Sequence, residues 1–291
     1  MTSHIPSLPP LPPYPAFNLA RLLQTVFHPE KGESVAILID LENPRDIADF
    51  GFLEDENTSI QKNAYTYFYQ NLQAEVLQKL GLTGGDIFAY QITGGSNLEL
   101  PDSAVSPSGK TVSLIDEVYK QYDIVLCIST YSATAPLTAA AKQYGFRGAT
   151  LHGLNDTILR SGLCVDYDEV SKSAEKLRLG MTRADAVEID YIVGKTSATL
   201  RLELGQQEAQ KSHGLCRGKT PDIANLPAGE IYFVPTGAAG EFPLTLEDGT
   251  IALVQVENLQ VQGASLLKGN QKSVDEYVRR VKSDPAVGMI G

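Results

Sequence analysis

The segment Ser34–Leu41, with the sequence SVAILIDL, decides the fold of the first half of this chain. It is a short apolar run rich in β-branched residues, and this pattern is typical of a buried strand. Three further runs follow at residues 86–92, 123–129 and 148–154, where apolar residues again dominate. We therefore expect four buried strands between residues 34 and 154.

Helical patterns separate these strands. Residues 60–80 carry apolar side chains at helical spacing and stop at Gly81, and residues 112–120 indicate a short helix. Residues 136–144 form an alanine-rich stretch with Pro136 in its first turn, which favours a third helix. Strands that alternate with helices predict a doubly wound, mostly parallel sheet. Residues 31–165 are thus expected to form an α/β, Rossmann-like domain.

The pattern changes near residue 165. Residues 168–179 predict one amphipathic helix, and residues 273–281 predict a last one. Between them, polar and apolar residues alternate, which indicates antiparallel strands at residues 187–194, 197–204, 230–234, 250–256 and 259–267. Residues 166–291 are therefore expected to form a β-rich α+β domain that follows the α/β domain.

Residues 1–30 are expected to be a proline-rich N-terminal arm. The stretch 5–15, IPSLPPLPPYP, holds six prolines, which fix φ and remove backbone donors, so it favours an extended conformation. Such an arm could lie on its own domain or on a neighbouring subunit. Docking into an aromatic groove of a partner is the alternative.

Composition and charge limit the kinds of partner. The 291 residues include 43% hydrophobic and 20% charged residues, enough apolar material for two cores, and the net charge is −11. The acidic balance disfavours nucleic acid, and the longest apolar runs are too short for a membrane helix. The three widely spaced cysteines (Cys127, Cys164 and Cys216) form no disulfide framework. Because no export signal is evident, we expect a cytoplasmic protein.

Two acidic residues end the first predicted strand. Asp40 and Glu42 lie at its carboxyl end, where α/β sheets place ligands, and together they could hold a divalent ion. With no partner visible in the sequence, they are interpreted as part of a solvated loop. The nearby LENPRD segment has no glycine, which disfavours a Rossmann nucleotide site. Gly94-Gly95-Ser96 also lacks a phosphate-loop pattern and is interpreted as a plain loop.

The histidines and thiols give weak signals. Four histidines are present, at positions 4, 28, 152 and 213, and His152 at a strand end is interpreted as structural. His213 and Cys216 have the spacing H-x2-C, but two residues cannot fill the four-ligand shell of a zinc site. A Cys216–His213 nucleophile pair stays open, with chance adjacency favoured.

The most informative motif is Asn225–Glu230, NLPAGE, followed by a strand-like run and Pro235. Together with the hairpin pattern at 194–205 and the segment 146–166, it resembles the aminopeptidase T/aminopeptidase S family of metallo-exopeptidases. Relatives of that family include ring-cleaving iron dioxygenases. The resemblance covers most of residues 120–291 and implies that Glu230 is a metal ligand. It assigns no catalytic or substrate-binding residue in this chain.

The resemblance implies a metal-dependent, aminopeptidase-like protein that hydrolyses amino-terminal residues of peptides. It implies zinc, cobalt or manganese if the site is completed beyond Gly291, and otherwise no cofactor. The metal domain then looks incomplete at its C-terminal end, either truncated or degenerate. Whether the chain is an enzyme is left open. The alternatives are a non-catalytic peptide-binding homologue and a non-haem iron dioxygenase relative. A peptide ligand is expected, and a homodimer is loosely implied.

Overall fold

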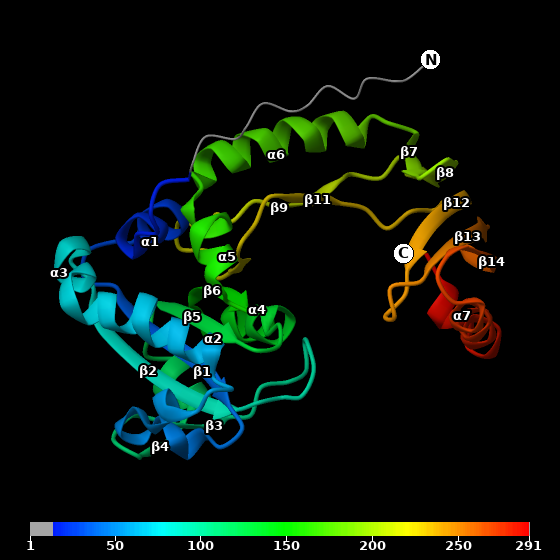
Figure 1. Ribbon diagram of the computed structural model, residues 1–291. Helices are drawn as coiled ribbons and strands as arrows, with labels where there is room; N and C mark the ends of the chain where they lie inside the picture. Colours follow the sequence, from blue (N-terminus) through cyan, green and yellow to red (C-terminus); the bar gives the residue numbers. More distant parts are fainter. Residues whose placement is uncertain (1–13, 291) are drawn as a thin grey trace. The chain divides into compact units, whose positions relative to one another are not determined.

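The structure is a computed structural model that describes residues 14–290, so most of the proline-rich stretch lies outside the described residues. The chain divides into two compact units (Figure 1). The first contains the described residues up to Ala174 together with Ser212–Glu230. The second contains Glu175–Lys211 and the residues from Ile231 onward. Residues 212–230 thus belong to the first unit, although the boundary expected near residue 165 assigns them to the second domain.

The first unit is built on a seven-stranded, mostly parallel sheet with the order β10-β6-β5-β1-β2-β3-β4. Strands β1, β2, β5, β6 and β10 run parallel, and β3 and β4 form an antiparallel hairpin at one edge. The mostly parallel sheet expected from the sequence is confirmed. Its strands are β1 (Ser34–Leu41), β2 (Thr83–Gln91), β3 (Ser103–Val105), β4 (Thr111–Ser113), β5 (Ile124–Ser129), β6 (Arg147–His152) and β10 (Ile223–Asn225).

The expected helix at 60–80 is found as consecutive helical segments, two of them π-helical, that run from α2 to α3. A helix that the sequence analysis missed lies inside the expected arm. Its N-terminus is capped by the Asn18 side chain, which accepts a hydrogen bond from the backbone of Arg21. The helical segments are α1 (Leu19–Phe27), η1 (Pro44–Glu54), α2 (Ser59–Asn63), η2 (Ala64–Tyr69), η3 (Leu72–Val76), α3 (Leu77–Leu80), η4 (Leu114–Tyr119), α4 (Thr134–Tyr144), α5 (Asp156–Arg160), η5 (Gly162–Cys164) and α6 (Tyr167–Thr182).

Both faces of the sheet are covered, as a doubly wound sheet requires. Successive side chains of a strand point to opposite faces, so β1 contributes to two cores. Ile37 and Ile39 belong to a core that also contains α1 and the segments from α2 to α3. Leu38 belongs to a second core with Leu137 of α4 and Val118 of η4. The sequence of β1 is apolar throughout because both faces of the strand are buried.

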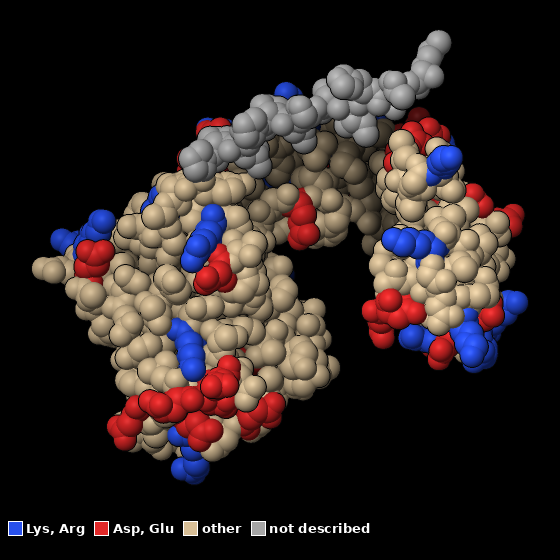
Figure 2. Space-filling model, viewed as in Figure 1, with Lys and Arg blue, Asp and Glu red and all other residues tan. Residues whose placement is uncertain are grey.

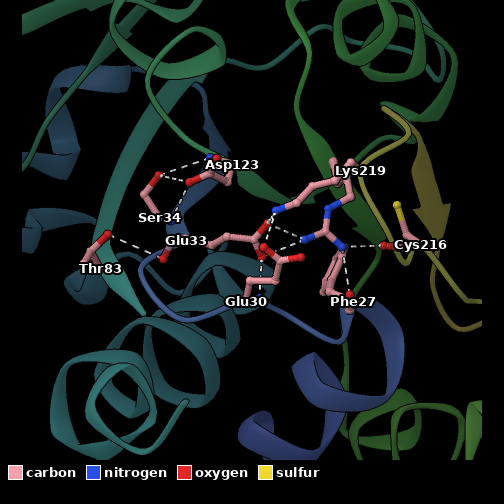
Figure 3. A network of polar contacts seen from close by, with 9 residues as sticks. Phe27, Glu30, Glu33, Ser34, Thr83, Asp123, Cys216 and Lys219 are labelled. Carbon is pink, nitrogen blue, oxygen red and sulfur yellow. Dashed lines mark hydrogen bonds and ion pairs between the residues drawn. The ribbon is translucent and has the colours of Figure 1, made fainter. Parts of the chain in front are cut away.

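A buried ion pair fastens the segment 212–230 to the amino end of the sheet (Figure 3). The Arg147 guanidinium donates to both carboxylate oxygens of Glu33, at 2.9 and 2.7 Å, and to the carbonyl oxygens of Phe27 and Cys216, at 2.8 and 2.9 Å. Lys219 lies 3.1 Å from the same carboxylate. Burial raises the pKa of Glu33, but the hydrogen bond from Glu30 and the cations Lys219 and Arg147 outweigh it, so the pKa is lowered.

The second unit holds a separate five-stranded antiparallel sheet with the order β14-β13-β12-β8-β7. Its core includes Val254, Val256, Val261 and Val281 of α7. A further two-stranded sheet pairs β11 with β9. The remaining elements are β7 (Ala186–Val193), β8 (Thr196–Glu203), β9 (Gln210–Ser212), β11 (Glu230–Tyr232), β12 (Gly237–Thr245), β13 (Ile251–Glu257), β14 (Gln260–Lys268), α7 (Gln271–Ser283) and η6 (Pro285–Gly288). Across residues 14–290, no helix is long and apolar enough to cross a membrane.

Candidate functional site

The strand order of the first unit reverses at β1. From β1 the chain moves to its neighbour β2 on one side and later returns to β5 on the other side. Doubly wound sheets bind ligands outside the carboxyl ends of the strands at such a switch point. Asp40 is the second-to-last residue of β1, and Thr130 directly follows β5. The topology therefore brings these two residues together at the edge where a ligand is expected.

Asp40 is buried, with only 1% of its surface exposed. The Gln61 side-chain amide donates to its carboxylate at 2.7 Å and to its main-chain carbonyl oxygen at 2.8 Å. The backbone N–H of Thr130 donates to the two carboxylate oxygens at 2.8 and 3.0 Å, and the Thr130 hydroxyl lies 3.2 Å from one of them. The interpretation of Asp40 as part of a solvated loop is therefore wrong, whereas Glu42 is exposed.

The environment of Asp40 changes its acidity. Burial raises the pKa of the carboxyl group, and the hydrogen bonds from Thr130 and Gln61 lower it by less. The net result is a pKa above the usual 3.8. A carboxyl group with a perturbed pKa beside a pocket is a candidate functional group, because shifted pKa values are concentrated at functional sites.

A pocket of about 320 Å³ opens beside Asp40, which is large enough for a small molecule. Its walls come from the residues that follow β1, β2 and β5, from the η1 segment and from the start of α2. Besides Asp40, Gln61 and Thr130, the lining residues are Leu41, Glu42, Asp46, Gly51, Phe52, Asp55, Asn57, Thr58, Ile92 and Tyr131. The pocket thus occupies the switch point of the sheet.

The backbone beside this pocket is strained. Asp49 and Phe50 both adopt left-handed conformations, with φ values of 48° and 57°. The Asp49 N–H donates to the carbonyl oxygen of Pro107, and the Phe50 ring packs 4.8 Å from that of Tyr65 and 5.4 Å from that of Tyr69. These contacts hold an unfavourable conformation in place. Strain of this kind is concentrated at ligand-binding segments.

Acidic side chains gather around the same segment. Figure 2 shows them on the lower part of the first unit, on the side where Figure 1 places β3 and β4. Residues 42–56 contain one basic residue, Arg45, and the exposed acidic residues Glu42, Asp46, Asp49, Glu54, Asp55 and Glu56. This surface therefore carries a negative potential beside the pocket.

Glu230, the predicted metal ligand, is exposed at the first residue of β11. Within the described range 14–290, no three or more His, Cys, Asp or Glu side chains are grouped so that they could hold a metal ion. The described residues thus provide no companions for Glu230 in a metal site. Its role as a ligand stays a prediction.

The His213–Cys216 motif has no features of a nucleophile. The Cys216 thiol donates to the carbonyl oxygen of Asp222 at 3.1 Å, and burial raises its pKa. A nucleophilic cysteine needs the opposite shift, because the thiolate is the reactive form. The His213 ring nitrogen Nδ1 accepts a hydrogen bond from the Leu215 N–H at 3.1 Å. These two hydrogen bonds are explained as local structural contacts.

The other described histidines and the Gly94-Gly95-Ser96 segment are not part of the pocket lining. His28 ends α1 in a left-handed conformation, and His152 is exposed at the end of β6. His4 lies outside the described residues. Gly94-Gly95-Ser96 is a loop, as expected, and its Ser96 hydroxyl accepts a hydrogen bond from the Ser132 N–H at 3.3 Å.

No protein-family model and no curated protein matches this chain. A solved structure that resembles it is that of 2,5-dihydroxypyridine dioxygenase from Pseudomonas putida KT2440. The likeness has a TM-score of 0.54 at 14% sequence identity, and it covers 93% of this chain and 74% of the dioxygenase chain. At this identity, the comparison shows similarity of fold.

The resemblance to the aminopeptidase T/aminopeptidase S family is therefore corrected. It depended mainly on the short Asn225–Glu230 motif, together with the patterns at 194–205 and 146–166. No family model or curated protein supports it, and the solved structure described above is a dioxygenase. A strand that follows a Pro/Gly turn is a local solution that unrelated chains share, so the motif was too short to establish a family. The peptide ligand and the homodimer expected with it stay predictions.

Sequence reasoning considered Asp40 as a possible ion ligand but interpreted it as part of a solvated loop, and it missed the partners Gln61 and Thr130. A signal was present, because a carboxylate inside an apolar strand requires donors from elsewhere in the fold. Residues that directly follow a neighbouring parallel strand, or begin the crossover helix, are the ones that can reach it. The sequence did not show which strand lies next to β1, and so it could not identify Thr130.

Proposed function

We propose that this chain binds a small-molecule ligand in the pocket at the carboxyl ends of β1 and β5. The observation that carries the proposal is the buried Asp40 carboxylate, held by Gln61 and Thr130 at the wall of that pocket. Burying a carboxylate costs free energy, and an apolar residue would complete a structural strand end at lower cost. A carboxylate retained at the switch point is explained by a ligand that it helps to bind.

The structural likeness supports a small-molecule ligand. The similar dioxygenase is named for 2,5-dihydroxypyridine, a small ring compound, and the likeness extends over 93% of this chain. A pocket of about 320 Å³ has room for a ligand of that size.

A fragment screen with two tryptophan variants tests the proposal. A library of small fragments would be added to the protein, and binding detected by ligand-observed NMR. Asn57→Trp places a bulky ring at an exposed residue that lines the pocket. Ala139→Trp places the same ring at an exposed residue of the same unit that lines a different hollow. We expect fragments whose binding Asn57→Trp abolishes and Ala139→Trp preserves. A library without such fragments would contradict the proposal.

A ring-cleaving dioxygenase is the second candidate, and the likeness to the Pseudomonas enzyme favours it. A non-haem iron site of this kind uses two histidines and a carboxylate on one face of the metal. The residues from 14 to 290 do not bring such a set together, so the described residues do not fit this site and no reaction step is assigned to iron. Oxygen uptake by the purified protein with Fe²⁺ and 2,5-dihydroxypyridine would support this candidate, and no uptake above a protein-free control would oppose it.

A further inference from the structure

We infer that the ligand of the switch-point pocket is a small organic cation that carries a protonated amine. The inference rests on the proposed ligand site and adds the charge and the hydrogen-bonding character of the ligand. Three features of the described residues support it. They are the orientation of the Gln61 amide, the negative charges of the pocket lining, and the hydrogen bonds that donors of the lining already form within the protein.

The Gln61 side chain lines the pocket and has an acceptor atom, Oε1, that no described donor uses. Only 4% of the residue is exposed, and its Nε2 donates to the carbonyl oxygen and the carboxylate of Asp40. Both of these oxygens can only accept hydrogen bonds, so the amide nitrogen of Gln61, and not its oxygen, must face Asp40. No donor among the described residues reaches Oε1, yet no buried side-chain oxygen or nitrogen in that part of the chain lacks a partner. Oε1 is therefore not fully buried, and Gln61 is one of the residues that line the pocket.

The charges of the lining have one sign. Four carboxylates line the pocket (Asp40, Glu42, Asp46 and Asp55), and the lining contains no Lys, Arg or His. Across residues 14–290, none of the four forms an ion pair with a basic side chain. Uncompensated carboxylates around a partly enclosed space concentrate a negative potential there. A cationic ligand would lower that electrostatic cost, and an anionic ligand would raise it.

Two of the lining side chains that can donate hydrogen bonds already do so within the protein. The Thr58 hydroxyl donates to the carbonyl oxygen of Phe52 at 2.7 Å, and the Asn57 amide donates to the Asp55 carboxylate at 3.0 Å. By contrast, no donor among the described residues forms a hydrogen bond with Gln61 Oε1 or with the Glu42 carboxylate. The pocket thus offers more acceptors than donors, and a ligand rich in N–H groups complements it.

An organic cation fits this lining better than a metal ion. A divalent ion requires several oxygen ligands that converge on one point, and the described His, Cys, Asp and Glu side chains form no group of three or more that could do so. The lining also includes Phe52, Ile92 and Tyr131, which offer apolar contact to a carbon skeleton. An amine attached to a small ring would use both parts of the lining.

Matched probes test the charge of the ligand. Benzylamine, benzyl alcohol and benzoate have similar size and differ in charge, and each would be titrated into the wild-type protein and followed by NMR. We expect benzylamine to bind about tenfold more tightly than benzyl alcohol, because hydrogen bonds that involve a charged group are stronger, and benzoate to bind more weakly than either. Asn57→Trp should abolish the benzylamine binding.

Matched variants test the role of the lining carboxylates. Glu42→Gln with Asp55→Asn removes two exposed carboxylates that line the pocket, and Glu54→Gln with Glu56→Gln removes two exposed carboxylates of the same segment outside the lining. Both pairs change the net charge equally. Only the first pair is expected to weaken benzylamine binding, by about tenfold.

The outcomes separate this inference from the proposed function. If benzyl alcohol or benzoate binds as tightly as benzylamine, at a site that Asn57→Trp blocks, the cation inference is overturned and the ligand site stands. Equal weakening by the two pairs of variants would also overturn the inference, since it would show a general effect of net charge. If no probe binds and the fragment screen finds no ligand of the pocket, both proposals fall.

Discussion

Arg147 and Glu33 meet in two hydrogen bonds, of 2.9 and 2.7 Å, and both side chains are almost fully buried. The same guanidinium also satisfies the carbonyl oxygens of Phe27 and Cys216, which belong to parts of the chain that are far apart in sequence. One side chain therefore links α1, the approach to β1 and the segment that leads to β10. The position of this ion pair at the amino end of the sheet separates it from the proposed ligand site, so it serves as a test of stability alone.

Arg147→Met should destabilise the first unit by about 3–5 kcal/mol, because it leaves Glu33 without its main buried partner and two carbonyl oxygens without a donor. Urea denaturation would measure the loss in the free energy of unfolding. Arg160→Met is the matched control, since the Arg160–Asp156 pair is exposed and should contribute less than about 1 kcal/mol. Equal losses in the two variants would contradict the assignment of a structural role to the buried pair.

The raised pKa of Asp40 predicts how stability depends on pH. Because the pKa of Asp40 is higher in the folded state than in the unfolded chain, the stability that this shift contributes is complete below the usual pKa of 3.8 and is lost as the pH rises through the folded pKa. Asp40→Asn does not titrate. The difference in the free energy of unfolding, variant minus wild type, should therefore increase as the pH rises from below 3.8 through the folded pKa of Asp40. Urea denaturation across this range would measure it, and a difference that falls with pH would contradict the raised pKa.

Gln61→Met should reduce stability by about 1–3 kcal/mol, because it removes a donor from the buried carboxylate and carbonyl oxygen of Asp40. Gln73→Met is the control. Gln73 belongs to the same crossover, and its amide donates to the carbonyl oxygen of Gly85 at 2.9 Å, but its side chain is exposed. We expect a smaller loss for this variant in chemical denaturation. If Gln61→Met were the milder of the two, the Asp40–Gln61 contact would not stabilise the switch point.

Two glycines should respond to alanine in opposite directions. A Cβ atom on Gly148 of β6 would lie 2.3 Å from the carbonyl oxygen of Val125. Gly148→Ala should therefore lower the free energy of unfolding by several kcal/mol. A Cβ atom on Gly180 of α6 would meet nothing within 4 Å, and alanine favours a helix, so Gly180→Ala should stabilise by about 0.5–1 kcal/mol. Thermal unfolding would compare them, and a stable Gly148→Ala variant would show that β5 and β6 can move apart.

The parallel core of the fold could be predicted from the sequence because apolar runs report burial directly. The run Ser34–Leu41 is buried along almost its whole length as β1, and the runs that became β2, β5 and β6 followed the same rule. The antiparallel hairpin β3–β4 was missed, since strands of three residues are too short to show a period. Helix α1 was missed because its residues were assigned to the arm as a whole.

The candidate site could be predicted only in part. The position of Asp40 at a strand end was visible, but its burial depends on Gln61 and Thr130, which are 21 and 90 residues away. Which residues meet at a sheet edge depends on the order of the strands, and a local pattern does not contain that order. A local motif also does not contain the other ligands of a metal site. The motif around Glu230 suggested such a site, but the described residues provide no group of ligands that includes it.

The discontinuity of the first unit has a consequence for synthesis on the ribosome. Strand β10 pairs with β6 at the edge of the sheet, yet it is made only after the hairpin β7–β8 of the other unit. The nascent chain therefore holds an Arg147 that lacks its Cys216 acceptor until residue 216 has emerged, and an unpaired β6 edge until residue 225 has emerged. During that interval the growing polypeptide would be open to strand exchange with a neighbouring copy, which makes the rate of translation across residues 152–225 relevant to its yield.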